Sequence, residues 1–113
     1  MKSWLERIAE AEQRQRRWWN LPWRFLGAFR PTFCWPFTSD DLRCWQALSL
    51  CPAGELCHRY GLYPWDARSL YRLGLDFGTA LMRGNVRRAR AIYVAMEDHA
   101  LELKRGAEMG EKA

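Results

Sequence analysis

Side chains that favour β-strands are scarce in this chain of 113 residues, in which Ile, Val and Thr together occur seven times against 14 Leu. Because strands are enriched in β-branched residues, this composition predicts an all-α fold. No stretch approaches the roughly 20 consecutive apolar residues that a membrane-spanning helix needs, and the N-terminal residues contain no apolar region of a secretory signal. We therefore expect a single cytoplasmic domain that neither crosses a membrane nor is exported.

Recognisable catalytic motifs are also missing. The sequence contains no Gly-rich dinucleotide-binding motif, no P-loop and no His-Glu-x-x-His zinc motif. His58 directly follows Cys57, and adjacent side chains on a helix point in different directions, so these two are not expected to form a nucleophile and its base. Carboxylates are spread along the predicted helices without the apolar surroundings that general acid catalysis needs. These absences predict that the protein is not an enzyme.

Capping signals and helical spacing of apolar residues divide the chain into five predicted helices. Ser3 and Glu6 have the spacing of a capping box, as do Thr38 and Asp41, and Gly61 is placed to end the third helix. The predicted helices span about Trp4 to Trp19, 41 to 50, Ala53 to Tyr60, Ala67 to Arg83 and Val86 to Arg105. The single domain then consists of an N-terminal helix with a basic aromatic arm (1–37), a helical core (38–106) and a frayed tail (107–113).

The last two predicted helices are expected to form an αα-hairpin that is the most stable part of the fold. Asp66 is predicted to cap the first of them, and the Gly84-Asn85 link is too short for any other connection. Gly74 and Gly78 interrupt that helix at a cost in helix propensity, which predicts a close backbone approach there. Apolar residues of the second helix follow the spacing of a heptad seam: Val86, Ala89, Tyr93, Met96, Ala100 and Leu103.

Aromatic and basic residues concentrate in one segment near the N-terminus. Between Arg14 and Phe37, eight aromatic residues are interleaved with five arginines, and residues 1–37 carry a net charge of +4 out of the total of +5. Trp and Arg are enriched at the energetic centres of interfaces, so part of this segment is expected to contact a partner. The predicted contact residues are Arg17, Trp18, Trp19, Trp23 and Arg24.

Arginines at the start of the last predicted helix form a second candidate contact. Arg87, Arg88 and Arg90 lie where the helix dipole favours anions rather than cations. They either meet phosphates or an acidic partner, or pair with carboxylates of the same chain, namely Asp66, Asp76 or the acidic residues of the second predicted helix. We include all three arginines in the predicted partner-binding surface.

Three classes of partner suit a surface of this composition. A protein is favoured, because Trp anchors with a charged rim are typical of protein interfaces. Nucleic acid is the alternative, because aromatic side chains stack on bases while Arg binds phosphates. A membrane surface is disfavoured, since Pro22 and Pro31 break any long amphipathic helix. In a fourth interpretation the aromatic residues pack on the helical hairpin and bind nothing.

Four cysteines, at Cys34, Cys44, Cys51 and Cys57, fall within 24 residues, and thiolates in that number can hold a zinc ion or an iron-sulfur cluster. The intervening nine, six and five residues do not provide the C-x₂₋₄-C pair of typical metal knuckles. The alternatives are reduced thiols buried as small apolar side chains, or disulfides. We expect no cofactor, with zinc or an iron-sulfur cluster as the alternative.

The segment from Cys51 to Cys57 reads Cys-Pro-Ala-Gly-Glu-Leu-Cys and resembles the third and fourth cysteines of the WhiB-like iron-sulfur regulators, in which a C-P-x₄-C segment closes the cluster site. The family's preceding C-x₂-C pair is replaced here by Cys44, seven positions before Cys51, and its glycine-tryptophan turn by residues 60–65. The resemblance implies a regulator that carries an iron-sulfur cluster.

These observations predict a small non-enzymatic accessory or regulatory protein that binds a larger macromolecular assembly through its Arg- and Trp-rich surface. One hypothesis within this class is an inhibitor of host machinery that a phage or mobile element encodes. The alternative is a nucleic-acid-binding transcriptional regulator with a Cys-ligated zinc ion or iron-sulfur cluster. The sequence leaves the identity of the partner and the oligomeric state open.

Overall fold

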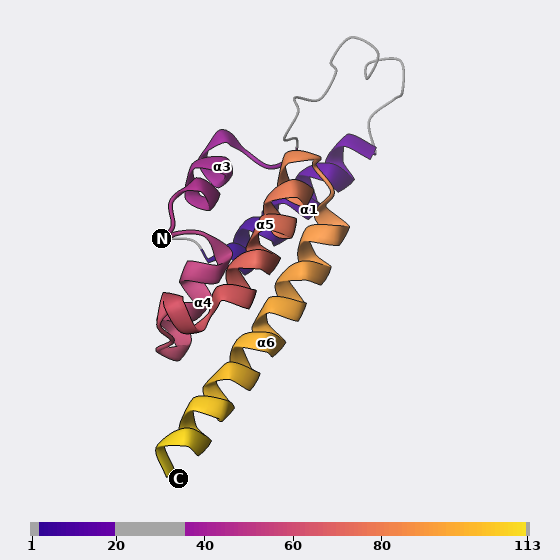
Figure 1. The fold of residues 1–113 in the computed structure, drawn as a ribbon. Coiled ribbons are helices and arrows are strands. Elements are labelled where there is room, and N and C mark those ends of the chain that lie inside the picture. Colours follow the sequence, from indigo (N-terminus) through magenta and orange to yellow (C-terminus); the bar gives the residue numbers. More distant parts are fainter. Residues whose placement is uncertain (1–2, 20–35, 113) are drawn as a thin grey trace.

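The computed structural model describes residues 3–19 and 36–112, and every regular element in these two ranges is helical, as the composition predicted. In chain order the elements are α1 (Trp4–Trp19), α3 (Ser39–Gln46), α4 (Pro52–Tyr60), the 3-10 turn η1 (Pro64–Asp66), α5 (Arg68–Met82) and α6 (Val86–Lys112) (Figure 1). These elements confirm the predicted all-α fold. No helix in the described residues is both long and apolar enough to cross a membrane.

The hairpin of α5 and α6 forms the centre of the fold. The chain reverses at Gly84, which has a φ of +69°, and the side-chain oxygen of Asn85 then accepts the backbone N–H of Arg88 at 3.1 Å. Phe77 from α5 and Met96 from α6 are completely buried. Buried positions of α6 follow the predicted seam: Val86, Ala89, Tyr93, Met96 and Ala100.

The remaining helices pack around this hairpin. α1 runs antiparallel to α6, α4 lies against both α5 and α6, and α3 contacts α5 (Figure 1). At the start of α1, the buried Trp4 indole donates its Nε1–H to the carbonyl of Leu50 at 2.6 Å. Its ring also meets Phe77 nearly edge-on, with 5.1 Å between ring centroids. Trp4 therefore anchors α1 to the chain before α4 and to α5.

The second predicted helix is shorter than expected. α3 begins at Ser39 and ends at Gln46, whereas the spacing of its apolar residues predicted a helix over 41–50. Ala47 takes an extended conformation, and the following turn brings the carbonyl of Leu48 against Gly54. Any Cβ at position 54 would overlap this carbonyl, so the turn depends on a glycine there.

Two helix ends differ from those predicted. Asp66 does not cap α5, because Pro64 starts the η1 turn and this turn includes Asp66; Ala67 then precedes α5 without a side-chain cap. At the other end, α6 continues through Gly106 to Lys112, where the sequence predicted an end near Arg105 and a frayed tail. Gly106 does not have the positive φ that ends helices at glycine.

The two glycines inside α5 have neighbours of different kinds. A Cβ at Gly78 would overlap the indole of Trp45, whose Nε1–H is donated to the carbonyl of Gly74 at 3.1 Å. A Cβ at Gly74 would meet Ala53 and Met96 at 3.7 and 3.8 Å, which are ordinary contacts. The close approach predicted for this helix is therefore made at Gly78, by a Trp side chain from α3 rather than by another backbone.

Candidate docking face

The predicted contact residues that the structure describes lie at one end of the helical bundle. Arg17 is exposed in the last turn of α1, and Arg87 and Arg88 are exposed in the first turn of α6. Figure 1 shows these helix ends side by side, consistent with the packing of α1 on α6. Five of the predicted site residues lie outside the described residues, either wholly or in their side chains: Trp18, Trp19, Trp23, Arg24 and Cys34.

The third arginine of the α6 cluster is paired within the chain. Nε of Arg90 lies 2.9 Å from Oε1 of Glu12 on α1. Pairing within the chain was one of the two alternatives for this arginine. Its partner is Glu12 rather than Asp66, Asp76 or an acid of the second predicted helix, because α1 lies beside the first turns of α6. This ion pair joins α1 to α6 across their interface.

The described cysteines, Cys44, Cys51 and Cys57, are free thiols. Cys51 caps α4: its Sγ accepts the backbone N–H of Gly54 at 3.2 Å, and its S–H is donated to the carbonyl of Leu48 at 3.0 Å. Burial raises the pKa of Cys51 and of Cys57, so both thiols are protonated at neutral pH. Within the described ranges, no group of three His, Cys, Asp or Glu side chains is placed to hold a metal ion. The segment that resembles the WhiB-like element forms the capped start of α4.

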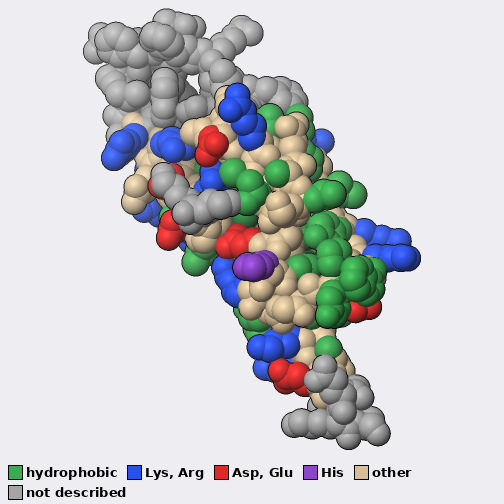
Figure 2. Space-filling view, turned by 90° about the vertical axis from the view of Figure 1, so that its left-hand side faces the viewer, with side chains coloured by type: hydrophobic (Ala, Val, Ile, Leu, Met, Phe, Trp, Pro, Cys, Tyr) green, Lys and Arg blue, Asp and Glu red, His purple; other side chains and the backbone are tan. Residues whose placement is uncertain are grey.

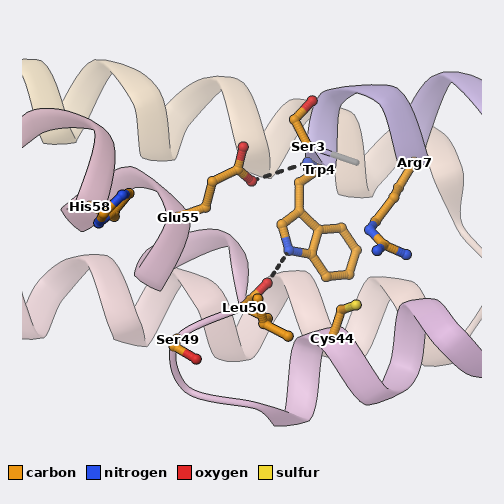
Figure 3. Close-up of a pocket in the computed structure, with 8 residues that line it drawn as sticks. All are labelled: Ser3, Trp4, Arg7, Cys44, Ser49, Leu50, Glu55 and His58. Carbon is orange, nitrogen blue, oxygen red and sulfur yellow. Dashed lines mark hydrogen bonds between the residues drawn. The ribbon is translucent and has the colours of Figure 1, made fainter. Parts of the chain in front are cut away.

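A pocket of about 420 Å³, lined by both apolar and charged side chains, opens between the start of α1, α3 and α4 (Figure 3). Glu55, which lines it, accepts the backbone N–H of Trp4 at 3.0 Å, and Arg7 pairs with Asp41 at 2.8 Å. Figure 3 shows the Trp4 indole reaching from α1 toward Leu50. The carboxylate and the guanidinium of this pocket therefore join helices to one another.

Two apolar grooves open side by side between the turn after α3, η1 and α5. The first, of about 510 Å³, is lined by Leu48, Ser49, Pro64, Arg68 and Tyr71. The second, of about 290 Å³, is lined by Trp45, Gln46, Leu48, Cys51, Ala53, Tyr71, Gly74 and Leu75. Because Leu48 and Tyr71 line both, the grooves form one continuous surface. We call this surface, together with Tyr63 and Trp65 beside Pro64, the docking face.

Four large apolar side chains of the docking face are mostly exposed. Their relative exposures are 76% for Leu48, 60% for Tyr63, 65% for Trp65 and 64% for Leu75. The rings of Tyr63 and Trp65 stack in parallel with their centroids 4.8 Å apart, so they present one aromatic surface. Figure 2 shows hydrophobic side chains gathered on the side of the molecule that carries α3 and α4. Large exposed apolar side chains beside a groove are typical of interaction sites.

Sequence reasoning did not identify the docking face. Trp45 and Leu48 have the three-residue spacing of one buried helical stripe, but α3 ends between them. Trp45 consequently packs on Gly78, while Leu48 points away from the core. The available signal was the Tyr63-Pro64-Trp65 sequence, in which two aromatic residues flank a proline between helices and belong to no apolar stripe.

No protein-family model, curated protein or solved structure matches this chain. Its function is therefore inferred from its own surfaces. In the described part of the chain, two surfaces carry side chains that are largely exposed and share one chemical character: the apolar docking face, and the basic ends of α1 and α6.

Proposed function

We propose that this chain is a non-enzymatic binding protein whose docking face receives an amphipathic α-helix of a partner protein. The observation that carries the proposal is the continuous pair of grooves, beside which Leu48 and Leu75 are both more than half exposed. Full burial of a leucine side chain is favourable by about 1.5–3 kcal/mol. A partner that covers these side chains therefore gains free energy of association from each of them.

The shape of the docking face suits a helix. Tyr71 and Leu75 lie one turn apart on α5, so the surface follows the axis of that helix, and Leu48 lines the same grooves from the turn after α3. The buried residues Ala53 and Gly74 also line the surface, and their small size leaves room for a partner side chain to enter. Amphipathic helices bind such grooves through apolar residues at i, i+4 and i+7.

The charge of the docking face favours a helix with acidic residues at one end. Among the described lining residues of the two grooves, Arg68 is the sole charged side chain. Arg72, one turn further along α5, is also exposed. A carboxylate of the partner placed near Arg68 would fix the direction of the bound helix, because no other charged side chain lines the two grooves.

The test is a selection of binders from a display library of helical peptides of about 20 residues, followed by affinity measurements on the tightest peptide. We expect selected peptides to carry apolar residues at helical spacing and an acidic residue near one end. Leu75→Ser and Trp65→Ala should each weaken binding at least about tenfold, because large apolar side chains at the centre of an interface contribute most of its energy. Val94→Ser, at a half-exposed position on α6, is the matched control and should leave the affinity unchanged.

Two results would overturn the proposal. One is a selection that yields no peptide whose affinity depends on Leu75. The other comes from sedimentation velocity of the chain alone: a dimer that Leu75→Ser dissociates would mean that a second copy of the chain covers the docking face. Arg68→Glu provides a further check. It should weaken the binding of peptides with an acidic residue at one end more than the binding of the same peptides with glutamine in place of the acidic residue.

A further inference from the structure

Acidic residues are absent from two long stretches of the sequence. Residues 13–39 contain five arginines and residues 77–96 contain four, and neither range contains Asp or Glu. These nine arginines are half of the 18 Lys and Arg residues in the chain. The overall net charge of +5 therefore conceals a strong separation of charge along the sequence.

The fold brings the described parts of both stretches to one end of the bundle. Because α1 runs antiparallel to α6, the last turn of α1 lies beside the first turn of α6 (Figure 1). The ion pair between Glu12 and Arg90, near these two helix ends, is consistent with this arrangement. The end of α5 lies there too, since only Gly84 and Asn85 separate Arg83 from α6. We call the exposed arginines of this region the cationic end: Arg16, Arg17, Arg83, Arg87 and Arg88.

The arginines of the cationic end are not neutralised by the described chain. Arg90 pairs with Glu12, and Arg14 pairs with Glu10. Considering residues 3–19 and 36–112 alone, no carboxylate forms an ion pair with any of the five arginines. Residues 1–2 and 20–35 contain no Asp or Glu and therefore add no acidic side chain.

Helix dipoles account for the arginines of α1 but not for those of α6. The C-terminal end of a helix carries a partial negative charge, so Arg16 and Arg17 stabilise the last turn of α1. The N-terminal end carries a partial positive charge, so Arg87 and Arg88 destabilise the first turn of α6. An anion bound at this place would interact favourably with both arginines and with the helix dipole.

We infer that the cationic end binds the phosphodiester backbone of duplex nucleic acid. Arginine forks bind phosphate oxygens in a bidentate manner, and they are the main phosphate contacts of DNA-binding proteins. Exposed arginines on two packed helices present several such forks at one end of the bundle, so the cationic end can contact more than one phosphate of a duplex. Contacts of this type are independent of base sequence.

This inference adds a second function to the proposed docking of a protein helix. The docking face includes Arg68 near the start of α5, whereas Arg83 follows the last residue of the same helix. At about 1.5 Å per residue, the length of α5 separates these two positions by roughly 22 Å. The two surfaces could therefore be occupied together, and the chain would hold a partner protein on nucleic acid.

Fluorescence anisotropy with a labelled DNA duplex of about 20 base pairs tests the inference. Four or five phosphate contacts predict that log K falls with log salt concentration with a slope of about −4. Two double variants test the two helices separately: Arg16→Gln with Arg17→Gln, and Arg87→Gln with Arg88→Gln. Each should change the slope from about −4 to about −2 and weaken binding at least about tenfold at 0.1 M salt. The matched control, Lys104→Gln with Arg105→Gln, removes the same charge from exposed positions nearer the other end of α6 and should change the affinity less than about threefold.

Three outcomes would overturn the inference. Equal losses in the control and in the cationic-end variants would mean that affinity follows net charge alone. Competition by polyglutamate as effective as unlabelled duplex would identify an acidic protein as the partner of this surface. Tighter binding of a single strand of the same length would exclude the duplex as the preferred ligand. None of the four substituted arginines of the cationic end lies on the docking face, so the peptide selection tests the proposed function independently.

Discussion

The guanidinium of Arg7 on α1 lies 2.8 Å from a carboxylate oxygen of Asp41 on α3, and both side chains are almost fully buried. The other oxygen of Asp41 accepts the backbone N–H of Thr38 at 2.8 Å, and the Thr38 hydroxyl accepts the N–H of Asp41 in return. One carboxylate therefore completes the capping box of α3 and joins that helix to α1. The exposed Asp40 gives Arg7 a second, longer contact at 3.2 Å.

Asp41→Ala is expected to lower the free energy of unfolding by about 3 kcal/mol, because it leaves the Arg7 charge buried and opens the cap of α3. The matched control is Asp40→Ala, which removes a neighbouring carboxylate that is 74% exposed and should cost less than about 1 kcal/mol. Urea denaturation followed by circular dichroism measures both variants. If both variants lost the same free energy of unfolding, Asp41 would contribute no more to stability than the exposed carboxylate of Asp40.

Gly74→Ala and Gly78→Ala make the same change one turn apart on α5 and are expected to have opposite effects. Alanine favours a helix interior by up to about 1 kcal/mol over glycine, and a methyl group at Gly74 would make ordinary contacts. At Gly78 the methyl group would displace the Trp45 indole and its hydrogen bond, at a cost of about 1–3 kcal/mol. The urea midpoint should therefore rise or stay unchanged for Gly74→Ala and fall for Gly78→Ala. A stable Gly78→Ala protein would mean that Trp45 is not held against α5.

Helix ends that depend on near neighbours were predicted from sequence, and those that depend on the surrounding fold were not. Thr38 and Asp41 form the predicted capping box, and Gly61 ends α4 with a φ of +66°. Asp66, in contrast, has a capping side chain, but the turn that Pro64 starts removes it from the capping position. Gly106 is also compatible with a helix end, yet α6 continues through it.

The two surfaces for which binding is proposed could be recognised from the sequence only in part. Arg17 and Arg87 could be identified as members of basic clusters because local charge is visible in the sequence. Their meeting at one end of the bundle depends on the packing of α1 on α6, which joins residues 70 or more positions apart, as in the pair of Glu12 with Arg90. The docking face was missed because the exposure of Leu48 follows from where α3 stops. Periodicity cannot reveal such a position.

Met96→Asp should unfold the protein. Met96 is completely buried in the seam of α6, and a carboxylate there would have no partner in an apolar environment. Val94→Asp, two residues away at a half-exposed position of the same helix, introduces the same charge and should cost less than about 1 kcal/mol. Thermal unfolding followed by circular dichroism distinguishes the variants. An unchanged melting transition for Met96→Asp would contradict the assignment of this seam as the centre of stability.

The hydroxyl of Tyr93 gives the fold a dependence on alkaline pH. The side chain is almost completely buried, and its hydroxyl has no hydrogen-bond partner among the residues that the structure describes. Burial and the charge of Glu55 raise the pKa of Tyr93 to about 12, above the ordinary value of about 10 for tyrosine, and outweigh the nearby Arg59 guanidinium, which acts to lower it. The unfolded chain therefore loses this proton at lower pH than the folded protein does.

Because the folded-state pKa of Tyr93 is the higher one, its contribution to stability is fully present below about pH 10 and is lost as the pH rises to about 12. Tyr93→Phe should remove this part of the alkaline loss and leave stability at pH 7 unchanged or higher, since the hydroxyl that it deletes is buried and unpaired. Tyr63→Phe, at an exposed ring, is the control and should keep the pH profile of the wild type. Urea denaturation between about pH 8 and pH 12 measures the difference between each variant and the wild type. If Tyr93→Phe and the wild type lose stability in parallel over this range, Tyr93 does not have a raised pKa in the folded protein.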